Sequence, residues 1–202
     1  TGGLNTGQTI MKAAVSTVKR LALELGGKNP HIIFADSDID AAIDNAVTAA
    51  FLHSGQVCSA GTRLIVERSI HDRVVKEIVR RAGQIRLGGP EDLSAETGPL
   101  ISKSHLEGVT KYVEKGIAEG ATLLVGGKRS ESSEHANGWY YLPTVLDNCN
   151  TKMFCVQDES FGPVMTVEVF DTEAQAIAIA NDTPFGLSGG LWSKDSAKAA
   201  RV

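Results

Sequence analysis

The stretch HIIFADSDIDAAIDNAVTAAF, residues 31–51, decides the fold class of this chain. It opens on a short run rich in apolar residues, which is typical of a buried strand, and the polar residues at 36–38 offer caps for a helix. From residue 39 to 52 the apolar residues recur at helical spacing and many are alanine, which predicts a helix packed closely in a core. The apolar run at 64–66 follows, so the sequence predicts a strand–helix–strand unit.

The rest of the chain continues the alternation of strand and helix patterns, without an internal repeat. We therefore expect an α/β fold in which a mostly parallel, twisted sheet is covered by helices on both faces. The polar stretch 128–138 is expected to be an exposed loop. The predicted strands lie at 20–25, 31–34, 64–66, 122–125, 140–146, 164–170 and 187–192, and the predicted helices lie at 6–15, 39–52, 71–85, 104–119, 172–180 and from 195 onward.

Composition narrows the functional classes. The 202 residues are 42% hydrophobic and 22% charged, with a formal net charge of −4 and no clustering of basic residues, so a nucleic-acid partner is not indicated. No apolar run approaches the roughly 20 residues needed to span a bilayer, so no membrane association is expected. Three cysteines without a CxxC pair favour a reducing compartment over a disulfide scaffold or a zinc site.

Cys58 is the first candidate for chemistry. It lies in GQVCSAGTR, residues 55–63, just beyond the predicted helix and among small residues that would let a substrate carbonyl approach closely. Backbone N–H groups at such a position can stabilise a thiolate and a developing oxyanion. The alternative is a cysteine that only packs in the core, which is the role we expect for Cys149 and Cys155.

Glu24 is the second candidate. It interrupts the apolar run LALELGG, residues 21–27, where an unpaired carboxylate is rarely tolerated. Burial would make it a stronger proton acceptor, able to take a proton from water, and a cysteine nucleophile with a glutamate base suits acyl transfer through a thioester. The alternative is a structural carboxylate paired with Arg20, Lys28 or Arg63.

Two other functions remain open from the residues alone. His53 lies shortly before Cys58, and a Cys–His pair would indicate a thiol hydrolase, although a histidine at a helix end also interacts favourably with the helix dipole. Alternatively, the chain is a non-catalytic structural member of its fold. No HxH or HExxH pattern or acidic cluster indicates a metal site.

Two glycine-containing turns are candidates for ligand binding. Gly2 and Gly7 bracket the start of the first predicted helix, where free N–H groups can face a phosphate, or where the glycines simply make a turn. In ESFGPV, residues 159–164, Glu159 and Phe161 precede a strand at an edge where α/β folds bind ligands. A glutamate can accept hydrogen bonds from ribose hydroxyls, and a phenylalanine can pack on a flat heterocycle. A fixed turn with a hydrophobic contact is the alternative.

Four motifs occur in order along the chain: LELGGKNP at 23–30, GQVCSAGTR at 55–63, ESFGPV at 159–164 and NDTPFGLSGGLWSKD at 181–195. With them the chain resembles the aldehyde dehydrogenase superfamily over its whole length. The resemblance implies oxidation of an aldehyde to a carboxylic acid, with NAD, or alternatively NADP, as the cofactor. In the family pattern Cys58 attacks the aldehyde, the resulting thiohemiacetal gives up a hydride to become a thioester, and Glu24 activates the hydrolytic water.

The resemblance also implies cofactor contacts. The turn at the start of the chain would face the pyrophosphate, the two residues after Glu24 would border the nicotinamide ring, Glu159 would hold the ribose and Phe161 would pack nearby. The family often has serine where this chain has Gly3, so only backbone could serve at that position. The expected cofactor residues are Gly2, Gly3, Gly7, Leu25, Gly26, Glu159 and Phe161.

By the same resemblance, residues 1–25 are expected to be a helix and strand remaining from the NAD-binding domain, and 26–202 a catalytic domain truncated at its C-terminal end. Most of the cofactor domain and an oxyanion-hole asparagine would lie outside the chain, so we expect these residues alone to be inactive as a dehydrogenase. The longer parent is expected to be a cytoplasmic homodimer or homotetramer that acts on a small aldehyde. Within the family, QVCSAGTR, EGATLLVGGKR and ESFGPVMTVEVF look most like betaine aldehyde dehydrogenases, which convert betaine aldehyde to glycine betaine.

Overall fold

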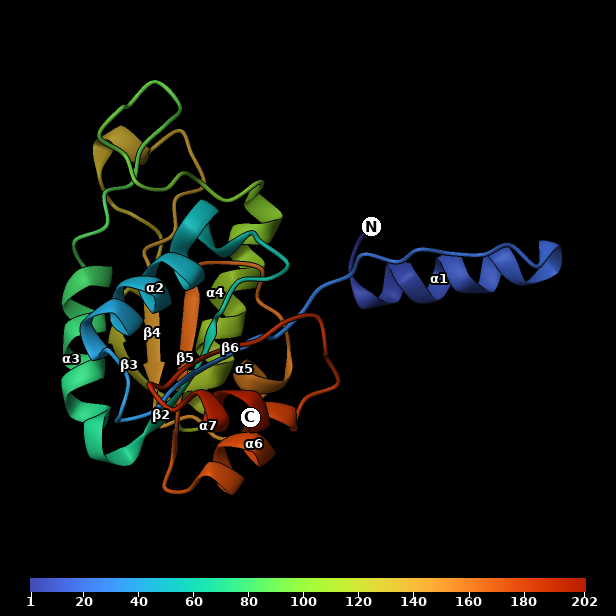
Figure 1. Cartoon of the computed structure of the whole chain (residues 1–202). Coiled ribbons are helices and arrows are strands. Elements are labelled where there is room, and N and C mark those ends of the chain that lie inside the picture. The colour runs from blue at the N-terminus through green and yellow to red at the C-terminus, as the bar shows by residue number, and fades with distance from the viewer.

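Six strands form one sheet in the order β3-β4-β5-β2-β1-β6 in the computed structural model, which describes residues 1–202 (Figure 1). Every neighbouring pair is parallel except β3 with β4, which is antiparallel. The predicted α/β fold with a mostly parallel sheet is therefore confirmed. The strands are β1 (Pro30–Ile33), β2 (Arg63–Glu67), β3 (Thr122–Val125), β4 (Thr144–Asp147), β5 (Val164–Phe170) and β6 (Gly190–Trp192).

Helices cover both faces of this sheet (Figure 1). Along β1, Ile33 joins a core cluster with α2 and α3, whereas Ile32 joins a second cluster with Ala176 of α6 on the opposite face. Successive side chains of a strand point to opposite faces, so a strand covered on both sides is apolar at most positions, as β1 is. The helices are α1 (Leu4–Ala14), α2 (Ile39–Phe51), α3 (His71–Ala82), α4 (Lys103–Ala118), α5 (Phe154–Gln157), α6 (Glu173–Asn181) and α7 (Ser196–Arg201).

The strand–helix–strand unit predicted from residues 31–66 is formed, with β2 in the middle of the sheet and β1 between β2 and the edge strand β6. The Asp38 side chain accepts a hydrogen bond from the Ala41 N–H at 3.2 Å and caps α2. The helix then packs on the sheet through buried residues that include Ala42 and Ala46, and β2 returns parallel to β1 with His31 opposite Leu64. The alanine-rich face lets α2 approach the sheet closely, as the sequence predicted.

The predicted strand at 20–25 is wrong. Residues 20–29 contain no strand or helix, and the segment's one backbone hydrogen bond within 20–25 joins the Gly2 N–H to the Glu24 carbonyl at 3.1 Å. A strand requires a neighbour that pairs with its N–H and C=O groups, and no strand of this chain lies beside this segment. Residues 20–25 therefore have the alternating apolar pattern of a strand but no neighbouring strand to pair with.

Several boundaries also differ from the sequence prediction. The helix expected from residue 104 begins at Lys103, and Ser102 caps it by accepting a hydrogen bond from the His105 N–H at 3.1 Å. The strand expected at 140–146 begins only at Thr144, directly after a proline that has no N–H to donate to a ladder, and the strand expected at 187–192 begins only at Gly190. The single-turn helix α5 was not predicted, because four residues carry no periodicity.

The helix α1 extends away from the rest of the molecule (Figure 1). Its only buried residue is Gly7, and its apolar residues Leu4 and Met11 are exposed. The amphipathic pattern that predicted a helix from about residue 6 to 15 is thus confirmed as helix, but its apolar face packs on nothing within this chain.

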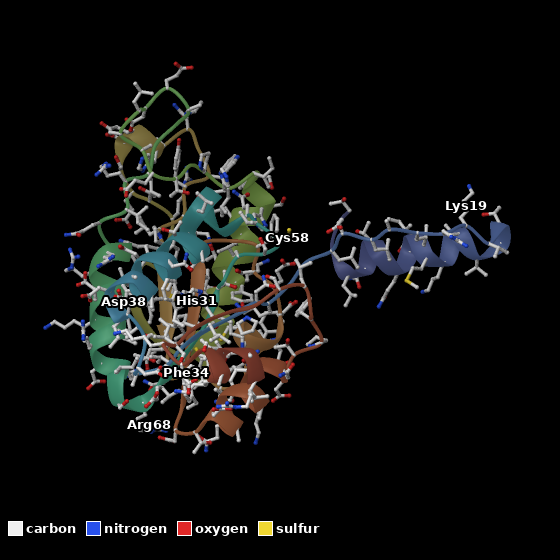
Figure 2. All side chains as sticks on the ribbon, viewed as in Figure 1. Lys19, His31, Phe34, Asp38, Cys58 and Arg68 are labelled. Carbon is white, nitrogen blue, oxygen red and sulfur yellow. The ribbon has the colours of Figure 1, made fainter.

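The buried imidazole of His31 gives the fold an acid-sensitive element. His31 lies on β1 inside the molecule (Figure 2), its Nε2 has no hydrogen-bond partner, and burial lowers its pKa to about 4. The unfolded chain therefore takes up a proton as the pH falls below about 6.5 while the folded chain does not, so stability is lost on acidification. We expect His31 alone to lower the free energy of unfolding by about 3 kcal/mol between pH 7 and pH 4.

Urea unfolding of His31→Phe against the wild type at both pH values checks this prediction. The variant should lose about 3 kcal/mol less than the wild type on acidification. Parallel pH profiles for wild type and His31→Phe would contradict the prediction.

Candidate active site

A tight loop after α2 presents Cys58 at the surface. The chain leaves the helix through the short 3₁₀ segment Leu52–Gly55, in which His53, Ser54 and Gly55 all have positive φ. At Gly55 a Cβ atom would lie 2.1 Å from the Gly162 carbonyl oxygen, so only glycine fits there. Cys58 follows in an exposed turn, at the side of the molecule from which α1 extends (Figure 2).

The left-handed residues of this loop are held by a neighbouring segment. The Ser54 N–H donates to the Thr97 hydroxyl at 2.7 Å, and that hydroxyl donates in turn to the Phe51 carbonyl at 3.2 Å. The Gln56 side chain accepts a hydrogen bond from the Ile101 N–H at 2.9 Å. Residues 97–101 therefore compensate for a backbone conformation that serine and histidine rarely adopt.

One cavity of about 330 Å³ joins the candidate residues from distant parts of the chain. It brings Cys58 and Glu24 together, and it includes every cofactor residue expected from the sequence except Gly7. Gly7 does not line the cavity but lies against Leu25, because a Cβ atom at Gly7 would be 2.7 Å from the Leu25 side chain. The cavity is lined by Thr1, Gly2, Gly3, Glu24, Leu25, Gly26, Cys58, Glu159 and Phe161.

Glu159 is half-buried against the segment that follows Glu24. Its Oε1 accepts a hydrogen bond from the Gly27 N–H at 3.1 Å, and a Cβ atom on Gly26 would lie 1.9 Å from its Oε2. Burial raises the pKa of the Glu159 carboxyl, while the Gly27 N–H and the charge of Lys28 act in the opposite direction. Glycine is therefore needed at position 26 for the carboxylate to lie at the cavity wall.

Phe161 is 39% exposed and has a left-handed backbone with φ of +48°. Its carbonyl accepts a hydrogen bond from the His105 Nε2 at 2.7 Å, which connects the turn before β5 to helix α4. A non-glycine residue in this conformation is strained and needs support from its surroundings. No local signal in the sequence connects His105 to Phe161, which lies 56 positions away in the chain.

Glu24 differs from the sequence prediction because its side chain is exposed, not buried. It also forms none of the ion pairs proposed as its structural role. Arg63 instead pairs with Glu168, at 2.5 Å between Nε and Oε2. Lys28 is fully buried, donates to the Thr62 hydroxyl at 3.5 Å, and has its pKa lowered to about 8 by burial. Glu24 is therefore a solvent-accessible carboxylate at the cavity.

The remaining candidates fall outside this cavity. The exposed His53 does not line it, and its imidazole makes no hydrogen bond, so the structure does not bring a Cys–His pair together there. Cys149 and Cys155 are both buried, as predicted for packing residues. A second cavity of about 460 Å³ lies beside the first, shares Glu159 and Phe161 with it, and is otherwise formed largely by one face of α4.

The structure also bears on metal sites and on membrane-spanning helices. No group of three or more His, Cys, Asp or Glu side chains comes together in a way that could hold a metal ion. None of the helices combines the length and the apolar character required to cross a membrane.

Comparison of the whole chain with known proteins identifies one protein family. The family model described as "Aldehyde dehydrogenase family" matches residues 1–202. The chain belongs to the aldehyde dehydrogenase family. The resemblance inferred from the four motifs is therefore confirmed.

Individual relatives within the aldehyde dehydrogenase family agree with this result. A betaine aldehyde dehydrogenase of Bacillus subtilis is 55% identical over 202 residues, which are 100% of this chain and 41% of that protein. A betaine aldehyde dehydrogenase of Staphylococcus aureus in complex with NAD+ matches with a TM-score of 0.97 and 48% identity, over 99% of this chain and 40% of that one. A point mutant of the same enzyme, bound to NAD+ and carrying a BME-modified cysteine, matches equally well, with a TM-score of 0.97. The chain thus spans about two fifths of the length of these relatives.

Proposed function

We propose that this chain is the catalytic part of an NAD(P)+-dependent aldehyde dehydrogenase in which Cys58 is the nucleophile and Glu24 the general base. The observation that carries the proposal is the single cavity that holds both side chains together with Glu159 and Phe161. A thiol, a carboxylate that water can reach and a potential ribose-binding group in one cavity fit aldehyde oxidation. They do not fit a thiol hydrolase based on His53, which lies outside the cavity.

The residues at the cavity fit the nicotinamide end of a dinucleotide. Its volume of about 330 Å³ is near the lower limit of small-molecule sites, roughly 300–1,000 Å³, so it suits one part of such a molecule. The Glu159 carboxylate would accept hydrogen bonds from ribose hydroxyls, and the Phe161 ring would pack on a flat ring. No side chain caps the first N–H groups of α1 after Gly3, which leaves them available to an anionic group. When bound, the cofactor would supply the hydride acceptor.

The chain's own residues would carry the remaining steps. The Cys58 thiolate attacks the aldehyde carbonyl and forms a thiohemiacetal. The Cys58 N–H has no acceptor within the chain, so it can donate to the oxygen that gains negative charge. After hydride loss the carbonyl carbon is held as a thioester on Cys58. Glu24 then takes a proton from water, which attacks the thioester and releases the carboxylic acid and the free thiol.

We further propose betaine aldehyde as the substrate and glycine betaine as the product. The support is the identity of 55% and 48% to two betaine aldehyde dehydrogenases.

We also propose that residues 1–25 belong with a cofactor-binding domain and 26–202 with the catalytic domain. The exposure of the apolar side chains Leu4 and Met11 on α1 is consistent with this division.

The proposal is tested on a full-length protein that contains this chain, by following NADH formation with betaine aldehyde and a panel of aliphatic aldehydes. Betaine aldehyde is expected to give the highest kcat/KM. The 202-residue chain alone is expected to give no NADH, because it spans only 41% of its Bacillus relative and would leave much of the cofactor unbound. Absence of NADH with every aldehyde in the full-length protein would refute the function, and a different best substrate would refute only the betaine assignment.

A further inference from the structure

Asn29 connects three segments of the chain from a buried position beside the cavity. It is 2% exposed and lies at the end of the segment that contains Glu24. Its Nδ2 donates to the Cys58 carbonyl at 2.9 Å and to the Ala60 carbonyl at 3.0 Å. Its Oδ1 accepts a hydrogen bond from the Ser188 N–H at 3.1 Å. Both amide protons and the amide oxygen therefore have partners.

The chemistry of these partners determines the orientation of the amide. Two of them are carbonyl oxygens, which only accept, and the third is an N–H, which only donates. Turning the amide over would place oxygen against two oxygens, so asparagine is matched here in one orientation. Gly27 provides the space, because a Cβ atom there would lie 2.6 Å from the Asn29 Oδ1.

These contacts act on the backbone that carries the thiol. A peptide group is planar, so holding the Cys58 carbonyl fixes the plane of the Cys58–Ser59 peptide, and holding the Ala60 carbonyl fixes the other end of the turn. Two backbone hydrogen bonds also restrain the turn: the Ala60 N–H donates to the Val57 carbonyl at 3.0 Å, and the Thr62 N–H donates to the Ala60 carbonyl at 2.9 Å. The Cys58 carbonyl has no backbone donor, so Asn29 alone holds it. The Cys58 side chain itself is exposed and is not packed in place.

We infer that Asn29 is a positioning residue for the nucleophile: its amide holds the Cys58 and Ala60 carbonyls away from the cavity and thereby directs the thiol and its backbone N–H toward the reacting carbonyl. The inference rests on the proposed role of Cys58 as the nucleophile. Asn29 would then act on the reaction through Cys58 and not through a contact of its own with substrate or cofactor. Near-attack geometry depends on such supports, because a misplacement of about 1 Å can cost a hundredfold in rate.

The test measures the reactivity of Cys58 directly, in a full-length protein that contains this chain. The rate of its alkylation by iodoacetamide is followed by peptide mass spectrometry over a range of pH, for the wild type, Asn29→Ser and Asn29→Asp. Serine is too short to reach both carbonyls. Aspartate keeps the acceptor for the Ser188 N–H but loses both donors. Asn181→Asp is the matched control, because it adds the same charge at an exposed amide on α6.

Both Asn29 variants are expected to alkylate about tenfold more slowly at neutral pH, with the pH profile of the reaction moved upward, because the thiolate loses its oriented N–H. For the same variants kcat for aldehyde oxidation should fall in parallel while KM stays near the wild-type value, and Asn181→Asp should match the wild type. The buried Cys149 and Cys155 should stay unlabelled, which reports an intact fold.

Two results would overturn the inference. One is a wild-type alkylation rate and pH profile in both variants. The other is labelling of Cys149 and Cys155 as fast as Cys58 in both, since Asn29 would then support the fold as a whole. The alkylation rate does not depend on aldehyde oxidation. A wild-type protein that makes no NADH but still shows the Asn29 effect would therefore refute the proposed function and not the positioning role.

Discussion

Replacing Cys58 with alanine in the full-length protein is expected to lower aldehyde oxidation by roughly three orders of magnitude or more, because no other group in the cavity can form the covalent intermediate.

Glu24→Gln should behave differently. It keeps the nucleophile but cannot take a proton from water, so we expect one rapid turnover that yields NADH and then stalls as a thioester on Cys58. A burst in stopped-flow absorbance and the added acyl mass on the protein measure this.

His53→Asn separates this mechanism from the thiol-hydrolase alternative. Asparagine tolerates the positive φ of +50° found at this position, so the loop should be retained while the imidazole is lost. We expect the variant to keep near wild-type oxidation. Loss of activity in His53→Asn together with normal turnover in Glu24→Gln would show that the base had been assigned to the wrong residue.

Arg63→Met is expected to cost about 3–5 kcal/mol in the free energy of unfolding, the largest stability change among single substitutions considered for this chain. Arg63 is fully buried in β2 and meets Glu168 of β5 at 2.5 Å and 3.3 Å, and its guanidinium also donates to the Ile179 and Ala180 carbonyls at the end of α6. Removing it would leave a carboxylate buried without a partner, whose pKa burial already raises.

Urea denaturation of three variants checks this expectation. Arg68→Met breaks an exposed pair with Asp171 that has similar geometry, 2.6 Å, and should cost about 0–1 kcal/mol. The double variant Arg63→Met with Glu168→Leu should recover much of the loss, because it leaves no unpaired charge in the core. An Arg63→Met protein as stable as Arg68→Met would show that burial does not determine the cost of these pairs.

Local patterns in the sequence predicted the central elements well. The helix at 39–52 and the strands at 31–34, 64–66 and 164–170 lie within a few residues of their predicted positions. Their signals are contained in periodicity and capping over about a dozen residues, and packing in the tertiary structure agrees with them. The prediction of a strand at 20–25 was wrong because the alternating pattern is local, whereas a strand also needs a pairing partner from another part of the sequence.

By itself the sequence determined the α/β class, the family and most of the residues that line the cavity, because these depend on residue type and order. Thr1 lines the cavity without having been expected there, and Gly7 does not line it. Only the tertiary structure decided that Glu24 is exposed, that Glu159 meets the Gly27 N–H from 132 positions away, and that Asn29 holds the Cys58 loop. Burial and hydrogen bonds of this kind depend on which distant segments pack together. The local sequence of residues 24–29 does not indicate which distant segments they contact. Their burial and hydrogen bonds are therefore known only from the folded structure.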